Sequence, residues 1–139
     1  MENETCLFCK IVAGDIPAEK VYETDDVLAF LDINPVNAGH TLVIPKAHHD
    51  HLLATPKDTF LSVMEAVHFL APIIKEATDA DGINIGINTL PAAGQEVFHL
   101  HVHIMPRFSG DGYQHWKGTP YQSQEEMQTV ADRIRKRLP

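Results

Sequence analysis

The sequence predicts an α+β fold with a mainly antiparallel sheet. Two short strand-like segments, 20–23 and 27–32, flank Thr24-Asp25-Asp26, which is typical of a hairpin turn. A long amphipathic helical segment and then further strands follow, and this grouping favours the α+β class. The sequence lacks the regular strand–helix alternation of a doubly wound parallel sheet, and it lacks a glycine-rich phosphate loop of either common type.

The length and composition suit one soluble globular domain, which we expect to span residues 1–139. Of these residues, 44 % are hydrophobic and 22 % are charged. No stretch approaches the roughly 20 apolar residues that cross a bilayer. The start, Met1-Glu2-Asn3-Glu4, is acidic where a signal peptide would be basic. We therefore expect a cytoplasmic protein that does not bind membranes.

The charge balance further limits the classes of partner that the protein can bind. The formal net charge is −8 with neutral histidines, which argues against nucleic acid or anionic membrane as a general partner. The basic cluster at 133–137 is expected in the last turns of a helix, where cations favour the helix dipole. Nine histidines is a high count for this length, and they are clustered. That clustering is the first specific indication of function.

The first half of the chain is expected to contain one short helix and a buried strand. Residues 7–13 are expected to be helical up to Gly14, with Pro17 beyond it. Residues 41–44 are rich in β-branched side chains and predict a strand that ends before Pro45.

The long helix is the clearest element in the sequence. We expect Thr55 to cap it, Pro56 to suit its first turn, and Asp58 to favour its positive end. Pro72 is expected to kink the helix or to end its first part. The apolar residues with the spacing of one helical face are Phe60, Val63, Met64, Val67, Leu70, Ala71 and Ile74.

Two strands and a helix complete the predicted fold. The strands are expected over 83–87 and 97–105, with Pro106 closing the second. Ser123 and Glu126 stand at capping-box spacing and are expected to open a final helix that ends near Leu138.

Three histidines alternate along the predicted strand 97–105. Because side chains alternate across a strand, His99, His101 and His103 share one face. A single histidine would usually be structural, whereas three imidazoles in register favour a functional site, either catalytic or metal-binding. The residues expected to face the core instead are Phe98, Leu100, Val102 and Ile104.

The segment before these histidines has the character of an anion pocket. Asn88 ends the preceding strand, and Ala92-Ala93-Gly94-Gln95 is a turn of small residues. Glycine permits close approach of the backbone to a ligand, and the Asn88 and Gln95 amides can bind phosphate or a leaving group. By itself the same segment is also a common hairpin connection.

The two cysteines, Cys6 and Cys9, are three residues apart and form a poor disulfide framework. In a reducing compartment such a Cys-x-x-Cys pair indicates half of a metal site or a redox pair.

Residues 94–106 resemble the signature of the histidine-triad (HIT) family, in which three histidines alternate with apolar residues. The segments Ile16-Pro17, 29–35 and 39–46 resemble the other familiar stretches of that family, in the same order. The N-terminal cysteines resemble its zinc-containing prokaryotic branch, which is related to the Hint-type phosphoramidases. The resemblance implies a five-stranded antiparallel sheet with one long helix and a C-terminal helix, assembled as a homodimer.

The resemblance also implies the catalytic residues. His101 matches the nucleophile, which forms a nucleotidyl-histidine intermediate that water then hydrolyses. His103 matches the residue that helps to hold the phosphate and assists proton transfer, and His40 matches a fourth histidine of the same site. His115 lies in a region that the family uses across its dimer, and we expect an interface or substrate-rim role for it.

Further matches imply a nucleotide site. Asp32 matches the residue that binds the ribose hydroxyls. Phosphate and leaving-group contacts are implied for Asn88, Gly94, Gln95 and the backbone around Val97, whereas Glu96 departs from the family, which often has Ser or Thr there. We expect Glu96 to point away from the phosphate or to act on the leaving-group side. The base slot is implied for Phe8, Ile16, Phe30, Ile33 and Leu42, each of which taken singly is also a plausible core residue.

A structural Zn²⁺ is the second implication of the resemblance. Its ligands would be Cys6, Cys9, His48 and His99, with His49 as an alternative to His48 and His51 as a weaker candidate. An unmetallated thiol pair is the other interpretation. With zinc bound, His99 cannot act as a free acid or base.

The expected function is therefore a nucleotidyl hydrolase that acts on purine nucleoside phosphoramidates or related AMP conjugates. The alternatives are a hydrolase of dinucleoside polyphosphates and a non-catalytic nucleotide-binding module. The partner would be a small purine nucleotide, with no nucleic acid.

Overall fold

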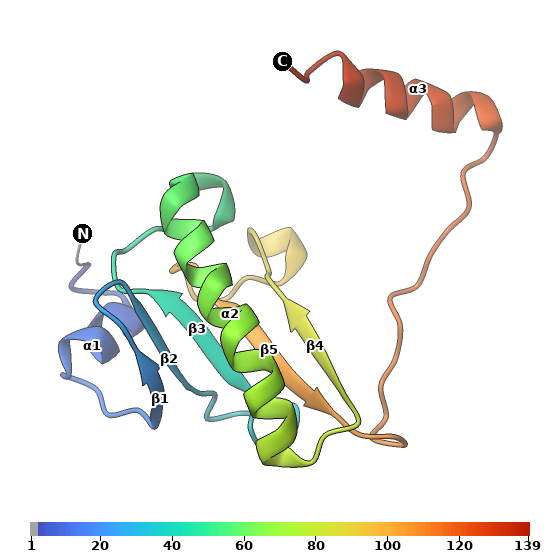
Figure 1. Cartoon of the computed structure of the whole chain (residues 1–139). Helices are drawn as coiled ribbons and strands as arrows, with labels where there is room; N and C mark the ends of the chain where they lie inside the picture. Colours follow the sequence, from blue (N-terminus) through green and yellow to red (C-terminus); the bar gives the residue numbers. More distant parts are fainter. Residues whose placement is uncertain (1–2) are drawn as a thin grey trace.

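The computed structural model describes residues 3–139 and shows a five-stranded sheet in the order β1-β2-β3-β5-β4 (Figure 1). All neighbouring strands are antiparallel, which confirms the predicted α+β fold. Met1 and Glu2, on which part of the signal-peptide argument rests, lie outside the described residues. The elements are α1 (Leu7–Ala13), β1 (Lys20–Glu23), β2 (Val27–Leu31), β3 (Thr41–Pro45), α2 (Lys57–Thr78), β4 (Gly82–Gly86), β5 (Val102–Arg107) and α3 (Gln124–Arg135), with short 3₁₀ turns at Leu52–Ala54 and Pro91–Ala93.

The N-terminal elements form where the sequence predicts them. Helix α1 ends at Gly14, whose left-handed φ of +84° favours glycine and whose N–H donates to the carbonyl of Ile11. In the turn between β1 and β2, the Thr24 hydroxyl accepts hydrogen bonds from the backbone N–H groups of Asp26 and Val27.

Helix α2 covers one face of the sheet (Figure 1). No helix among residues 3–139 combines the length and apolar character needed to span a bilayer. The helix buries Val63, Ala66, Val67, Leu70 and Ile74 against the sheet residues Val27, Ala29, Val43, Val102 and Ile104. All of these buried helix residues except Ala66 lie on the predicted apolar face.

The predicted limits of α2 need two corrections. Thr55 does not cap the helix, because its hydroxyl donates to the carbonyl of His51; the N-cap position is Pro56. Pro72 does not end a first part, since the helix continues through it to Thr78. Pro72 and His68, whose carbonyl loses its helical partner, are both exposed, so water can satisfy that carbonyl.

The opposite face of the sheet carries α1. Because side chains alternate along a strand, the sheet residues that α1 covers alternate in sequence with those that α2 covers. This second core contains Cys6, Phe8, Cys9 and Ile11 from the α1 region, and Leu28, Phe30, Leu42 and Ile44 from the sheet.

Strand β5 starts later than predicted, at Val102 instead of Val97, and it runs through Pro106 to Arg107. Residues 97–101 do not join the sheet, because the N–H of Leu100 donates to the carbonyl of His49 instead. Phe98 was expected in the core and is 41 % exposed, whereas the predicted core residues Leu100, Val102 and Ile104 are buried.

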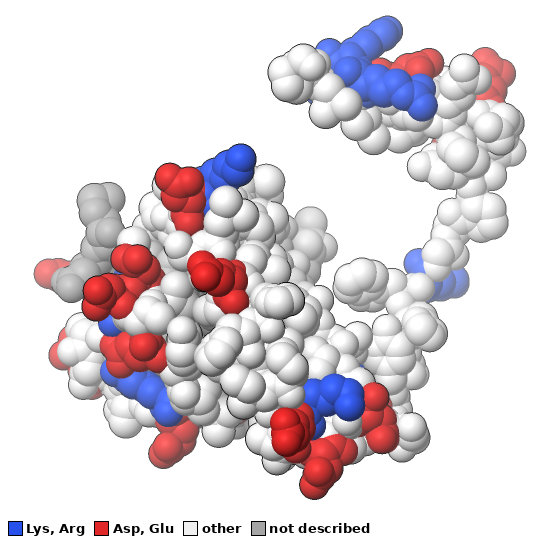
Figure 2. All heavy atoms as spheres, viewed as in Figure 1, with Lys and Arg blue, Asp and Glu red and all other residues white. Residues whose placement is uncertain are grey.

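The last residues, 113–139, form a C-terminal arm that leaves the sheet and ends in α3 (Figure 1). The Ser123 hydroxyl accepts from the N–H of Glu126, as the capping-box spacing predicts, and the helix ends at Arg135 instead of near Leu138. None of the α3 residues is buried. Figure 2 shows Lys and Arg side chains gathered on this helix and many carboxylates over the body of the molecule.

Candidate functional site

Three imidazoles meet where β3 and β5 lie side by side. His40 immediately precedes β3, His101 immediately precedes β5, and His103 lies within β5. The Nε2 atom of His40 is 2.9 Å from Nδ1 of His103, and the rings of His101 and His103 are 5.0 Å apart. The fold therefore brings together the three residues expected to be catalytic, although they come from two distant parts of the chain.

Backbone partners determine which nitrogen of each ring carries the proton. Nδ1 of His101 is 2.7 Å from the carbonyl oxygen of His99, which can only accept, so Nδ1 bears the hydrogen and Nε2 keeps its lone pair. Nδ1 of His40 accepts from the N–H of Val36, so the neutral ring bears its hydrogen on Nε2 and donates to His103. His103 then accepts at Nδ1 and carries its own hydrogen on Nε2.

Burial keeps these rings neutral near pH 7. Loss of hydration lowers the pKa of His103 to about 4, and the neighbouring charges of His101 and His40 act in the same direction. Burial also lowers the pKa of His101 and of His40, while the negative charge of Asp32 partly opposes this effect. The ring of His101 is therefore a neutral imidazole with an available lone pair.

Asp32 lies at the edge of this cluster. Its Oδ1 accepts from the N–H of Asn34, and its Oδ2 is 3.7 Å from Nε2 of His40. The side chain is 21 % exposed, so a carboxylate oxygen beside the imidazoles remains open to a ligand hydroxyl.

The residues expected to form the base slot fall into two groups. Phe8, Phe30 and Leu42 are buried in the core between α1 and the sheet, and Ile16 packs against the same cluster. The ring of Phe8 meets the His101 ring edge-on, with centroids 5.2 Å apart. Ile33 is 92 % exposed, which excludes the interpretation of this residue as core.

The turn before the histidines is held by Gln95, which is 5 % exposed. Its Nε2 donates to the carbonyls of Asp50 and Val97, and its Oε1 accepts from the N–H of Leu90, a residue with a left-handed φ of +73°. All side-chain polar atoms of Gln95 are thus engaged with backbone. The side chain thereby fixes the shape of the turn, and the contact between its amide and phosphate remains a prediction.

The other residues of this rim are available to a ligand. Gly94 has a φ of +91°, which requires glycine, and its carbonyl accepts a long hydrogen bond of 3.5 Å from the Asn88 amide. Asn88 and Glu96 are both exposed. The predicted phosphate contacts of this rim and the orientation of Glu96 remain predictions.

A second constellation unites Cys6, Cys9, His48 and His99, whose possible ligand atoms all lie within 4.8 Å of one another. Nδ1 of His99 is 3.5 Å from Sγ of Cys6 and 3.6 Å from Sγ of Cys9, and Nδ1 of His48 is 3.3 Å from Cys9. Of the two alternatives, the fold places His48 in this group and not His49, whose carbonyl instead accepts from Leu100.

The donor set fits a metal ion on its own chemistry. Nε2 of His99 donates to the carbonyl of Pro45, and Nε2 of His48 donates to the carboxylate of Asp50, so both rings turn an unprotonated Nδ1 toward the thiols. Two imidazole lone pairs and two thiols match a tetrahedral Zn²⁺ site with no open position. Burial lowers the pKa of His99 to about 4, which keeps the ring in the neutral form that binds metal.

Asp32, His40 and His103 form another group of close donor atoms. They do not suit a metal, because Val36 fixes the proton of His40 on the nitrogen that would have to bind it. The arrangement is a hydrogen-bonded pair of imidazoles instead.

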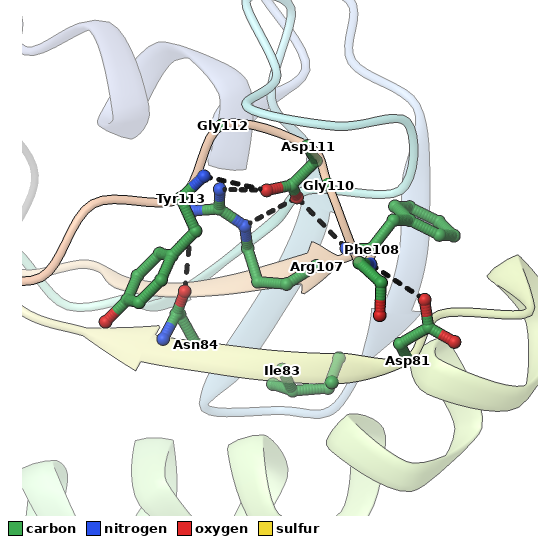
Figure 3. A pocket seen from close by; sticks show the side chains of 11 residues that line it. Asp81, Ile83, Asn84, Arg107, Phe108, Gly110, Asp111, Gly112 and Tyr113 are labelled. Carbon is green, nitrogen blue, oxygen red and sulfur yellow. Dashed lines mark hydrogen bonds and ion pairs between the residues drawn. The ribbon is translucent and has the colours of Figure 1, made fainter.

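A surface hollow of about 710 Å³ lies away from the histidines, beside β4 and the turn after β5 (Figure 3). Arg107 and Asp111, which both line this hollow, form an ion pair. The Arg107 guanidinium holds the pKa of the Asp111 carboxyl far below its usual range. Arg107 also lies 4.8 Å from the ring centre of Tyr113. These contacts organise the start of the C-terminal arm and offer no catalytic group.

A family model described as the HIT domain matches residues 13–110. The chain belongs to the HIT family. It is 45 % identical over 139 residues to Protein hit of Bacillus subtilis, with 97 % of this chain and 95 % of that protein covered. It is also 42 % identical over 111 residues to adenylylsulfatase HINT3 of Arabidopsis thaliana, with 80 % of this chain and 56 % of that protein covered.

Solved structures of HIT proteins agree with this fold. The structure of SMU.412c from Streptococcus mutans is 44 % identical, has a TM-score of 0.92, and aligns with 97 % of this chain and 86 % of its own. A zinc-bound histidine triad family protein from Mycobacterium smegmatis is 38 % identical, has a TM-score of 0.76, and aligns with 95 % of this chain and 96 % of its own. Because the first alignment covers 97 % of this chain, it includes most of the C-terminal arm.

Three partners of this HIT site were not predicted from the sequence. Asp50 orients His48, and backbone groups of Pro45 and Val36 orient His99 and His40. Asp50 could have been predicted from the order His48-His49-Asp50, because a metal-binding histidine often donates its other ring N–H to a nearby carboxylate. The roles of Pro45 and Val36 could not be predicted in this way, because both use backbone groups, which do not depend on the type of side chain.

Proposed function

We propose that this chain is a nucleotidyl hydrolase that attacks the α-phosphate of purine nucleotide conjugates, and that it acts as a purine nucleoside phosphoramidase. The observation that carries the proposal is the hydrogen bond from Nδ1 of His101 to the carbonyl of His99. It leaves the Nε2 lone pair on a neutral, rigidly held imidazole, which is the form of histidine that acts as a nucleophile.

In the first step, Nε2 of His101 forms a bond to the α-phosphorus while the bond from phosphorus to the leaving group breaks. The leaving amine or oxyanion needs a proton. Solvent water supplies it, and the Nε2–H of His103 donates a hydrogen bond to the departing atom, since Nδ1 of this ring is already engaged with His40. The product of this step is a nucleotidyl-His101 intermediate.

In the second step, a water oxygen attacks the same phosphorus and the bond to His101 breaks. The water proton passes to solvent, the neutral ring of His101 is restored, and a nucleoside monophosphate is released. His40 is a positioning residue in this scheme. Its Nδ1 accepts from the backbone N–H of Val36, and an amide does not give up its proton, so His40 cannot relay one.

Binding of the nucleotide would use the residues around this centre. The open carboxylate oxygen of Asp32 would accept from the ribose hydroxyls, and exposed Ile33 would cover one side of the base. Gly94 would bring the backbone close to the phosphate.

The adenylyl part of the proposed substrate is supported by one relative. The Arabidopsis relative is named an adenylylsulfatase, which supports adenylyl conjugates as the substrate class. Hydrolysis of dinucleoside polyphosphates uses the same chemistry and is the second candidate. A non-catalytic binding module is disfavoured, because mere binding does not need the free lone pair of His101.

The experiment compares turnover of an adenosine phosphoramidate with turnover of diadenosine tetraphosphate. His101→Ala should abolish turnover while AMP still binds, and His68→Ala, an exposed histidine on α2, serves as the matched control. A slow substrate should trap the adenylyl group on His101, as located by mass spectrometry. Equal inertness to both substrates, or unchanged turnover in His101→Ala, contradicts the proposal.

We infer that Cys6, Cys9, His48 and His99 hold a structural Zn²⁺. Elemental analysis of protein purified without chelators should find about one zinc ion per chain. Cys9→Ser should remove it and His49→Ala should not. Metal-free protein contradicts this inference.

We also propose a homodimer in which the C-terminal arm contacts a second copy. Met127 and Ile134, on one side of α3, are 41 % and 59 % exposed, and a helix of 12 residues is marginal without packing. Strand β4 lies at the edge of the sheet with one side unpaired, and the basic end of α3 complements the acidic body (Figure 2). Light scattering should give twice the chain mass, and Ile134→Asp should weaken the dimer more than the exposed control Gln128→Asp. A monomer at micromolar concentration contradicts the proposal.

A further inference from the structure

The two cysteines of the metal constellation enclose the start of α1. Cys6 is also the N-cap of this helix, since its Sγ accepts from the N–H of Cys9. Helix α1 has only seven residues, which is too short to be stable by its own hydrogen bonds. Its position on the sheet therefore depends on buried side chains and on what holds the two thiols to His48 and His99.

Between the cysteines in sequence stands Phe8, which is 4 % exposed. Its ring meets the imidazole of His101 edge-on, at 5.2 Å between centroids and an interplanar angle of 85°. It meets Phe30 at 5.5 Å in a similar geometry, so the ring is wedged between the sheet and the nucleophile. The same short helix thus carries two metal-binding thiols and the side chain that flanks His101.

The second restraint on His101 comes from His99, one of the residues of the metal constellation. The carbonyl of His99 accepts from Nδ1 of His101 at 2.7 Å, while the side chain of His99 faces the thiols and donates to Pro45. Displacement of His99 would therefore disturb the bond that fixes the tautomer of the nucleophile. One restraint on His101 is thus Phe8, which lies between the two cysteines in sequence, and the other is the backbone of His99.

We propose that this metal site is a positioning device for the nucleophile: the bound ion fastens α1, and through it Phe8, against the imidazole of His101. Phe8 is then a positioning residue for the reaction as well as a wall of the base slot. This inference rests on the proposed function. It makes metal content a determinant of turnover, although the ion itself lies outside the reacting atoms.

The expected effect follows from the strength of an edge-to-face contact. Such pairs contribute enough beyond their buried area to change a rate about threefold to tenfold when lost. Loss of the ion releases the whole helix, so metal-free enzyme should be at the upper end, with kcat about tenfold lower. Hydrogen exchange of residues 7–13 should accelerate at the same time, because the helix loses its anchor.

The test uses the full chain, first stripped of metal with a chelator and then reloaded with Zn²⁺. We expect reloading to restore both slow exchange in α1 and kcat. Phe8→Leu should keep zinc and slow exchange while kcat falls at saturating substrate. Leu7→Ala, next to it in α1 and 45 % exposed, should keep both kcat and zinc content.

Two results would overturn the inference. One is a stripped enzyme with unchanged exchange in α1 and unchanged kcat. The other is Phe8→Leu with an altered KM and a wild-type kcat, which would restrict Phe8 to base binding. If zinc-loaded wild type turns over no adenosine conjugate, the proposed function fails instead, and the exchange measurement still decides whether the metal anchors α1.

Discussion

Gln95 offers a sharp test of how the phosphate rim is built. Its buried amide makes three hydrogen bonds, at 2.6 and 3.1 Å to the carbonyls of Asp50 and Val97 and at 2.8 Å from the N–H of Leu90. Each bond contributes about 1 kcal/mol net, and buried groups left without partners cost more. Gln95→Ala should therefore lower the free energy of unfolding by about 3 kcal/mol.

Gln95→Glu separates the donors of this amide from its acceptor. The carboxylate can still accept from Leu90, but it faces two carbonyl oxygens that need donors. At neutral pH this variant should be at least as unstable as Gln95→Ala, and it should recover as the carboxyl becomes protonated.

Urea unfolding measures these differences, and Gln128→Ala on the exposed face of α3 is the control, with an expected change below about 0.5 kcal/mol. A Gln95→Ala protein within about 0.5 kcal/mol of wild type would refute the assignment of Gln95 to the support of the turn.

Three further predictions concern stability. Asp111 accepts five hydrogen bonds, so Asp111→Ala should lower the urea midpoint clearly more than Gln128→Ala does, and a midpoint equal to that of wild type would contradict this role. The pKa of His103 is lowered to about 4 from about 6.5 in the unfolded chain, so the unfolded state binds more protons between these values. Stability should hence be full above about pH 7 and fall by up to about 3 kcal/mol toward pH 4, and equal urea midpoints at about pH 7.5 and pH 5 would exclude this; His103→Asn should flatten the curve. At Gly39 the φ is +96° and an added Cβ would lie 2.5 Å from a methyl of Thr78, whereas Gly14 has φ +84° and open space, so Gly39→Ala should lower the melting temperature clearly more than Gly14→Ala.

Local sequence patterns predicted most of the fold because each element has a local cause. The glycine after α1, the turn residues before β2 and the helical period of α2 act within a few residues. The start of β5 could not be predicted in this way. There the carbonyl of Pro45 is taken by the side chain of His99, so the ladder between β3 and β5 begins only at Val102.

The candidate site was predictable in its residue types and not in its proton positions. The alternation of histidines indicated a functional strand, and the resemblance to the HIT family supplied the distant His40 and His48. Which ring nitrogen is free depends on N–H and carbonyl groups that folding brings near, such as the N–H of Val36 and the carbonyl of His99. The dependence of Gln95 on three backbone partners has the same origin.

The C-terminal arm has a consequence for how this protein responds to dilution. No α3 residue is buried in its own chain, so in the proposed dimer, where a second copy stabilises this helix, its helix content would be set by mass action. The core around α2 would keep its structure at any concentration, whereas α3 would lose helix as copies separate. Circular dichroism of a dilution series should then show a partial loss of helix, and proteases should cut residues 113–122 first in the most dilute sample.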